Sequence, residues 1–156
     1  MVLQIAALTH QFPSLSELHA SFNRISSITI PPTATIRSLI LEYNEITSLS
    51  SISALSKLPN LEHLGLRGNN ITVASVDDDD FQFSPTVKSL DVSYNSIDSW
   101  SFVNALPSLF PGLESLRISN NPLFNQPVGP SRVTNLPERP MTVDEAFMLT
   151  LARLKN

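Results

Sequence analysis

A short repeated pattern constrains this chain more than any other feature, and it is clearest in residues 61–71, LEHLGLRGNNI. Leu64 and Leu66 fall on one face of a short strand, because side-chain direction alternates along a strand. Leu61 and Ile71 turn inward at either end of that strand. Asn69 follows at the bend, where its side-chain amide can bond backbone groups of neighbouring coils that the turn leaves without partners.

The same pattern, LxxLxLxxN followed by x and an aliphatic residue, occurs five times, with small departures at the apolar positions. The copies begin near residues 15, 36, 61, 87 and 113, and their asparagines are Asn23, Asn44, Asn69, Asn95 and Asn121. Spacings of 21, 25, 26 and 26 residues between these asparagines lie inside the period of roughly 20–29 residues that is typical of leucine-rich repeats. The predicted fold is therefore an α/β leucine-rich repeat solenoid, a right-handed horseshoe with a parallel concave sheet and short helices or irregular turns on the convex side.

The segments between the predicted strands indicate different return paths. Apolar residues at helical spacing predict helices over residues 50–58 and from Trp100 onward, the second with Ser99 or Asp98 as its N-cap. Pro107 and Pro111 are expected to make the rest of the second path irregular. The prolines within residues 31–33 instead predict extended or turn structure in the first return path. Residues 1–12 are expected to form part of a helix that leads into the first coil.

Four consecutive aspartates occupy residues 77–80. Adjacent carboxylates repel one another and resist burial, which favours a solvated loop; a contact with a cation or a basic partner is the alternative. Phe81 and Phe83, directly after this run, are expected to insert into the core between coils.

We predict one leucine-rich repeat domain over residues 1–156, which would be a fragment of a larger protein. Residues 124–141 are rich in proline and asparagine without an apolar period, so we expect an insertion loop there. Residues 142–155 are predicted to form a capping helix, because Thr142 and Glu145 make a capping box. Its apolar face should cover the exposed core of the last coil, as a terminal repeat requires.

Composition excludes several classes of function. The chain has no cysteine, which excludes thiol catalysis and cysteine-based zinc sites, and its three histidines form no predicted metal site. A net charge of −4 disfavours nucleic-acid binding, and no apolar run approaches the length of a membrane span. We therefore expect no enzymatic activity, no cofactor, no catalytic or metal-binding residue, and no nucleic-acid or membrane partner.

The outward side chains of the stacked strands are predicted to line a concave binding face. Aromatic and arginine side chains dominate the energetics of protein interfaces, which favours a protein partner; the alternative for the aromatic residues is that they wedge between coils. Glu42 and Arg67 could also form a simple cross-strand ion pair. The centre of the face, at Gly65 and Gly68, is expected to be open. The candidate protein-binding residues are Glu17, His19, Phe22, Ile40, Glu42, Tyr43, His63, Arg67, Asp91, Tyr94 and Arg117.

Several stretches resemble the leucine-rich domain of tubulin-folding cofactor E, especially in its fungal members. They are residues 39–49, LILEYNEITSL; 91–100, DVSYNSIDSW; 116–123, LRISNNPL; and 145–154, EAFMLTLARL. The resemblance implies a cytoplasmic, cytoskeleton-associated chaperone that binds α-tubulin during assembly or dissociation of the tubulin heterodimer, together with other tubulin-folding cofactors. It also implies flanking CAP-Gly and ubiquitin-like domains, with this chain as a monomeric middle domain.

The competing hypothesis is another cytosolic or nuclear leucine-rich repeat adaptor, of the phosphatase-regulator or spliceosomal-scaffold type. Such adaptors share short repeats, a lack of cysteine and a helical cap. Their partners differ, so identification of the bound protein separates the two hypotheses.

Overall fold

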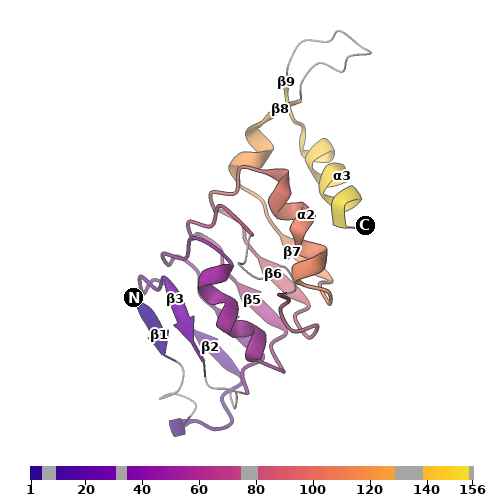
Figure 1. Cartoon of the computed structure of the whole chain (residues 1–156). Coiled ribbons are helices and arrows are strands. Elements are labelled where there is room, and N and C mark those ends of the chain that lie inside the picture. Colours follow the sequence, from indigo (N-terminus) through magenta and orange to yellow (C-terminus); the bar gives the residue numbers. More distant parts are fainter. Residues whose placement is uncertain (5–9, 31–34, 75–80, 129–138, 155–156) are drawn as a thin grey trace.

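The computed structural model describes residues 1–4, 10–30, 35–74, 81–128 and 139–154 (Figure 1). The run 77–80, residue 155 of the predicted capping helix and the whole proline segment 31–33 lie outside the described residues. Within the described part, the chain winds through successive coils whose strands stack side by side (Figure 1).

The concave side is a parallel five-stranded sheet with the order β2-β4-β5-β6-β7. The strands are β2 (Glu17–His19), β4 (Ser38–Ile40), β5 (His63–Gly65), β6 (Ser89–Asp91) and β7 (Ser115–Arg117). The register is uniform, since the first residue of each strand pairs with the first residue of the next. Each strand comes from one copy of the repeated pattern, which confirms the predicted α/β leucine-rich repeat solenoid.

The convex side is irregular, and its helices lie on the opposite side of the coils from the sheet (Figure 1). It contains η1 (Ser50–Lys57), α2 (Trp100–Leu109) and η2 (Pro122–Asn125). In the first return path the chain is extended instead, and β3 (Ser27–Thr29) pairs in parallel with β1 (Val2–Gln4). The prediction of a helix over residues 1–12 is therefore wrong for residues 2–4, because β3 offers them a strand partner and the amide of Ser26 donates to the Met1 carbonyl at 2.8 Å.

The two predicted convex helices, η1 and α2, follow their apolar spacing, with one exception. Ile52, Leu55 and Leu58 are fully buried and stand three residues apart, which matches the 3₁₀ geometry of η1 better than an α-helix. In α2, Ser99 is the N-cap and its side chain accepts a hydrogen bond from the Ser101 amide at 3.2 Å. The expectation that Pro107 ends regular structure is wrong: α2 continues to Leu109, whose side chain is anchored in the core.

A continuous hydrophobic core fills the space between the sheet and the convex paths. Phe83 is buried and its ring stacks on that of Phe110 with centroids 4.4 Å apart, while Phe81 packs edge-on against Phe83. The phenylalanines after the acidic run therefore reach the core, as predicted.

The repeat asparagines form a buried ladder that joins consecutive coils. The Oδ1 atom of Asn69 accepts from the Ile46 amide of the preceding coil at 3.0 Å, and its Nδ2 donates to the carbonyls of Leu41 and Leu66 at 2.9 Å. The other three buried asparagines repeat this arrangement: Asn44, Asn95 and Asn121. The first, Asn23, is exposed and its Nδ2 donates to the Ser21 carbonyl.

The C-terminal part begins with a short antiparallel pair, β8 (Pro127–Val128) with β9 (Arg139–Pro140), and ends with α3 (Val143–Leu154). The capping box is present, since the Glu145 amide donates to Thr142 Oγ1 at 3.3 Å and the Thr142 amide donates to the Glu145 carboxylate at 2.9 Å. Near its other end, α3 holds Arg153 over the Trp100 ring of α2 at 4.4 Å. None of its side chains is fully buried, so α3 lies beside the last coil without sealing it.

Candidate functional site

The structure places the predicted concave residues in rows along the sheet, because the strands share one register. Strand positions carry Glu17 and His19 on β2, Ile40 on β4, His63 on β5, Asp91 on β6 and Arg117 on β7. The positions just after the strands carry Phe22, Glu42, Tyr43, Arg67 and Tyr94. Of this set, the structure joins four side chains into one contact chain, Phe22, Tyr43, Arg67 and Tyr94, which we call the aromatic row.

The aromatic row runs across four coils. The rings of Phe22 and Tyr43 stack with centroids 4.7 Å apart and planes 9° from parallel. Arg67 Nε donates to the Tyr43 hydroxyl at 3.2 Å, and the Arg67 guanidinium lies 4.3 Å from the centroid of the Tyr94 ring. The hydrogen bond to Tyr43 also raises the pKa of Arg67 above its ordinary value. Each contact joins adjacent coils, so the row continues the order of the strands.

The three aromatic residues of the row share an unusual backbone conformation. Phe22, Tyr43 and Tyr94 stand directly before the repeat asparagine, with φ of 61°, 52° and 55°. Gly68 and Asn120 occupy the same position of their repeats and have φ of 67° and 56°. Glycine and asparagine adopt left-handed backbone readily, whereas a bulky residue there is strained. The chain therefore holds three rings at a position that disfavours them.

These rings remain accessible instead of wedging into the core. Phe22 is 74% exposed, Tyr43 40% and Tyr94 47%. The rings do contact neighbouring coils, as the alternative expects, and they also keep exposed outer surfaces. Exposed apolar rings held in strained geometry are typical of functional surfaces.

The centre of the concave face is not open, contrary to the sequence-based expectation. A Cβ atom at Gly68 would lie 2.5 Å from the Tyr43 ring, so the absence of a side chain there seats the ring. At Gly65, a Cβ would lie 3.0 Å from Ile40 Cδ1. The two glycines thus receive side chains of the preceding coil. Sequence reasoning missed this role, although a glycine at a position that carries aromatics in three other repeats was a usable signal.

The proposed ion pair between Glu42 and Arg67 does not form, because Arg67 is engaged by the two tyrosines. Instead, Arg117 approaches Asp91 with 4.0 Å between the charged atoms. Asp91 Oδ1 also accepts from the amide and the hydroxyl of Ser93, at 2.9 and 2.5 Å. These contacts hold the Asp91 carboxylate between Ser93 and Arg117.

The remaining candidates, Glu17, His19 and His63, are exposed on their strands. His19 and His63 stand on β2 and β5, with β4 between them. Within the described ranges, no group of three or more His, Cys, Asp or Glu side chains is arranged to hold a metal ion. No helix in that part of the chain is long and apolar enough to cross a membrane.

Comparison with known proteins agrees with this architecture. Residues 34–97 match the leucine rich repeat family. The chain is 36% identical over 124 residues to tubulin-folding cofactor E of Arabidopsis thaliana, and the matched region covers 77% of this chain and 23% of that protein. It is 31% identical over 140 residues to tubulin-specific chaperone E of Xenopus laevis, covering 86% of this chain and 26% of that protein. The chain thus spans about a quarter of the length of these relatives.

A solved structure shares the fold. A chain in the crystal structure of the Drosophila melanogaster SNF/U2A' complex superposes with a TM-score of 0.57 at 23% identity, over 68% of this chain and 59% of that one. Identity at this level supports the repeat architecture alone.

Proposed function

Because the chain is a leucine-rich repeat protein related to tubulin-folding cofactor E, we propose that it is the protein-binding module of a tubulin-folding chaperone. Its partner is α-tubulin, which it binds during assembly or dissociation of the tubulin heterodimer, in company with other tubulin-folding cofactors. It acts in the cytoplasm, in association with the cytoskeleton, as a monomer and without catalysis.

The aromatic row is the observation that carries this proposal. Tyrosine and arginine are enriched among interface hot spots, and here they alternate in direct contact across three coils, with Phe22 of a fourth coil stacked on Tyr43. Three strand spacings of about 4.8 Å give the row a length of roughly 14 Å. A surface of this length and composition suits a folded protein better than a small ligand.

Preorganisation strengthens the argument. Stacking of Tyr43 on Phe22 and the hydrogen bond from Arg67 fix the side chains before a partner arrives. A partner then binds without the entropic cost of ordering these long side chains. The rest of the same face is formed by the apolar Ile40 and by the polar residues Glu17, His19, Glu42, His63, Asp91 and Arg117.

The proposal is tested by measuring the affinity of this chain for purified tubulin heterodimer by biolayer interferometry. We expect Arg67→Ala and Tyr43→Ala each to weaken binding by at least about tenfold, because each removes a central hot-spot contact; tenfold corresponds to about 1.4 kcal/mol. Cross-linking through a photoreactive residue at Phe22 should label α-tubulin in preference to β-tubulin.

Lys57→Ala is the matched control, since Lys57 is an exposed cation on the convex η1. It should leave the affinity unchanged within about twofold. Absence of binding to tubulin, or equal effects of Lys57→Ala and Arg67→Ala, would contradict the proposal. Retention of a phosphatase catalytic subunit or a small ribonucleoprotein from extract, with tubulin absent, would favour the adaptor hypothesis instead.

A further inference from the structure

Each coil forms the same set of backbone hydrogen bonds with the coil that follows it. A carbonyl before the strand accepts two amides of the next coil, as Lys88 does from Glu114 and Ser115 at 2.9 Å. Two amides after the strand donate to carbonyls of the next coil. The Val92 amide donates to the Arg117 carbonyl at 2.8 Å, and the Tyr94 amide donates to the Ser119 carbonyl at 3.0 Å. The equivalent carbonyls are those of Ser16, Arg37 and Glu62, and the equivalent amides are those of Ala20, Leu41, Leu66, Phe22, Tyr43 and Gly68.

In the last coil the corresponding groups are the Glu114 carbonyl and the amides of Ile118 and Asn120. Within the part of the chain that the structure describes, none of these three groups has a backbone partner. The strand β7 is the last of its sheet. Its outer edge therefore presents the same donors and acceptors that the next parallel strand satisfies in each of the preceding coils.

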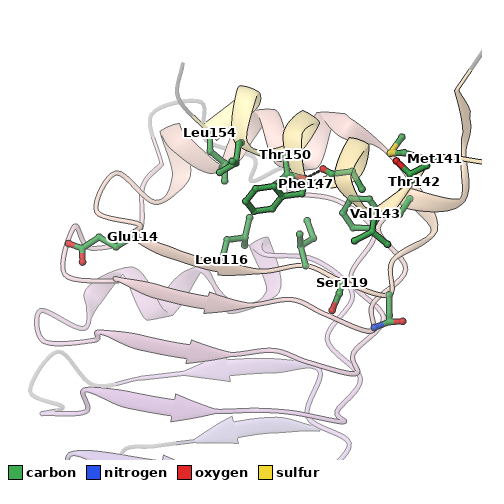
Figure 2. Close-up of a pocket in the computed structure, with 14 residues that line it drawn as sticks. Glu114, Leu116, Ser119, Met141, Thr142, Val143, Phe147, Thr150 and Leu154 are labelled. Carbon is green, nitrogen blue, oxygen red and sulfur yellow. Dashed lines mark hydrogen bonds between the residues drawn. The ribbon is translucent and has the colours of Figure 1, made fainter.

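A groove lies directly along this edge. A cavity of about 580 Å³ separates β7 from α3, and Figure 2 shows Val143, Phe147 and Leu154 of α3 facing the strand that carries Leu116. Glu114, Ile118 and Asn120 also line it. The free backbone groups and the cavity thus belong to one site.

The side chains on the helical wall of this groove lack cover. Val143 is 85% exposed and Phe147 is 62% exposed, although both belong to the apolar face of α3. The helix contacts α2, where Arg153 lies over Trp100, and a cavity remains between the helix and β7. The groove therefore combines an apolar wall with a strand edge.

A charged residue, Glu114, lies at the end of the groove where β7 begins. From β4 onward, the residues that precede the strands alternate in sign, and ion pairs join Arg37 to Glu62 at 2.5 Å and Lys88 to Glu114 at 2.8 Å. Glu114 closes this series, and its side chain is 69% exposed. A basic residue on the occupant would continue the alternation.

We propose that this groove binds an extended segment of a partner protein, which adds to the sheet as a sixth parallel strand. The segment carries a basic residue followed by apolar residues at alternate positions, as in Lys88-Ser89-Leu90-Asp91-Val92 of this chain itself. Its backbone pairs with Glu114, Ile118 and Asn120, and its apolar side chains contact Phe147 and Val143. A lipid or another purely apolar ligand would fill the cavity but would cover the backbone groups without supplying hydrogen-bond partners, which is costly once water is displaced from them. Strand addition satisfies both features.

The probe is a fluorescent peptide with the sequence of residues 86–95 of this chain, TVKSLDVSYN. We expect saturable binding by fluorescence anisotropy, at least tenfold slower hydrogen exchange of the Ile118 and Asn120 amides in the complex, and loss of binding when Leu90 and Val92 of the peptide are replaced by serine. Ala146→Trp fills the groove and should weaken binding at least tenfold. Ala152→Trp, on an exposed position of the same helix, is the control and should change binding less than twofold.

Four results would overturn the proposal. They are the absence of saturable binding up to about 1 mM peptide, equal effects of the two tryptophan variants, protection of the Ile118 and Asn120 amides without peptide, and a sedimentation profile showing that a second copy of the chain occupies the edge. Arg67→Ala should leave peptide binding unchanged, which separates this site from the aromatic row.

Discussion

At the scale of single residues, the position before each repeat asparagine determines what the concave edge presents. The backbone is left-handed there in all five repeats, because the chain must turn from the strand toward the convex side. In the first four repeats the amide at this position also donates to the next coil. Left-handed backbone costs a bulky residue roughly 1–3 kcal/mol. Phe22, Tyr43 and Tyr94 carry that strain, and Gly68 avoids it while seating the Tyr43 ring. Strain at an exposed position is expected where function selects the side chain.

The buried asparagine ladder gives a stability prediction at the same scale. Asn69→Ala leaves the Ile46 amide and the carbonyls of Leu41 and Leu66 without their side-chain partners. We expect the free energy of unfolding, measured by urea denaturation, to fall by about 1–3 kcal/mol.

Asn23→Ala is the matched control for this change. Asn23 occupies the same repeat position but is exposed, and its side-chain amide donates only to the nearby Ser21 carbonyl. Its replacement should cost less than about 0.5 kcal/mol. Equal losses from the two variants would show that the ladder does not stabilise the stack.

At the scale of elements, spacing and capping explain the helices better than intrinsic propensity does. Apolar residues three apart produce the 3₁₀ form of η1, and Ser99 fixes the start of α2. In α3 the capping box fixes the start, but the helix buries no side chain completely. Its position therefore depends on few contacts, among them the pairing of Arg139 with Glu145 and of Arg153 with Trp100.

The capping box makes the start of α3 sensitive to acid. Hydrogen bonds from the Arg139 guanidinium and then from the Thr142 amide lower the pKa of Glu145 from an ordinary 4.5 to about 2. A carboxyl with a lowered pKa stabilises the folded state above its ordinary pKa, and this contribution is lost as the pH falls from about 4.5 toward 2. The Glu145 side-chain carboxyl should therefore titrate near pH 2 by NMR, with fraying of α3 over the same range.

Arg139→Gln removes the larger cause of this shift and should move the titration midpoint of Glu145 back toward its ordinary value. A midpoint near 4.5 in the unaltered chain would contradict the hydrogen bonding seen at this cap.

At the scale of the whole molecule, each coil is stabilised by the coils on either side of it. Backbone bonds, the asparagine ladder and the core all join consecutive coils, so stability is a sum of neighbouring interfaces. The central coil that carries β5 has two such interfaces, whereas α3 touches only the last coils. The stack is therefore expected to open from its C-terminal end.

Native-state hydrogen exchange tests this gradient directly. We expect the amides of Leu41 and Leu66, which donate to the following coil at 2.8 and 2.7 Å, to exchange only by global unfolding. The Ala146 amide at the start of α3 should exchange at least a hundredfold faster, through local opening. Uniform protection across the stack and α3 would contradict this view.

The solenoid, the five strands in register, the asparagine ladder and the capping box could be predicted from the sequence because each depends on residues close together in the chain, repeated at a regular interval. The candidate face followed from strand alternation for the same reason. Nothing local indicated that residues 2–4 pair with β3, since that strand partner is supplied by the first return path. Contacts between coils could be assigned only when the spacing and rotation of the coils were known.

Residues 61–71 show which features the sequence determines and which depend on the tertiary structure. Its leucines and Asn69 determined a strand, a core and a ladder by their order alone, because side-chain direction in a strand has a period of two. That Gly68 holds the ring of Tyr43, and that Arg67 bridges Tyr43 and Tyr94, was decided by the tertiary structure, because these side chains meet across coils that are 24 to 27 residues apart in the chain. The groove beside β7 was decided in the same way, by a helix that packs on α2 and leaves the last strand without a neighbour.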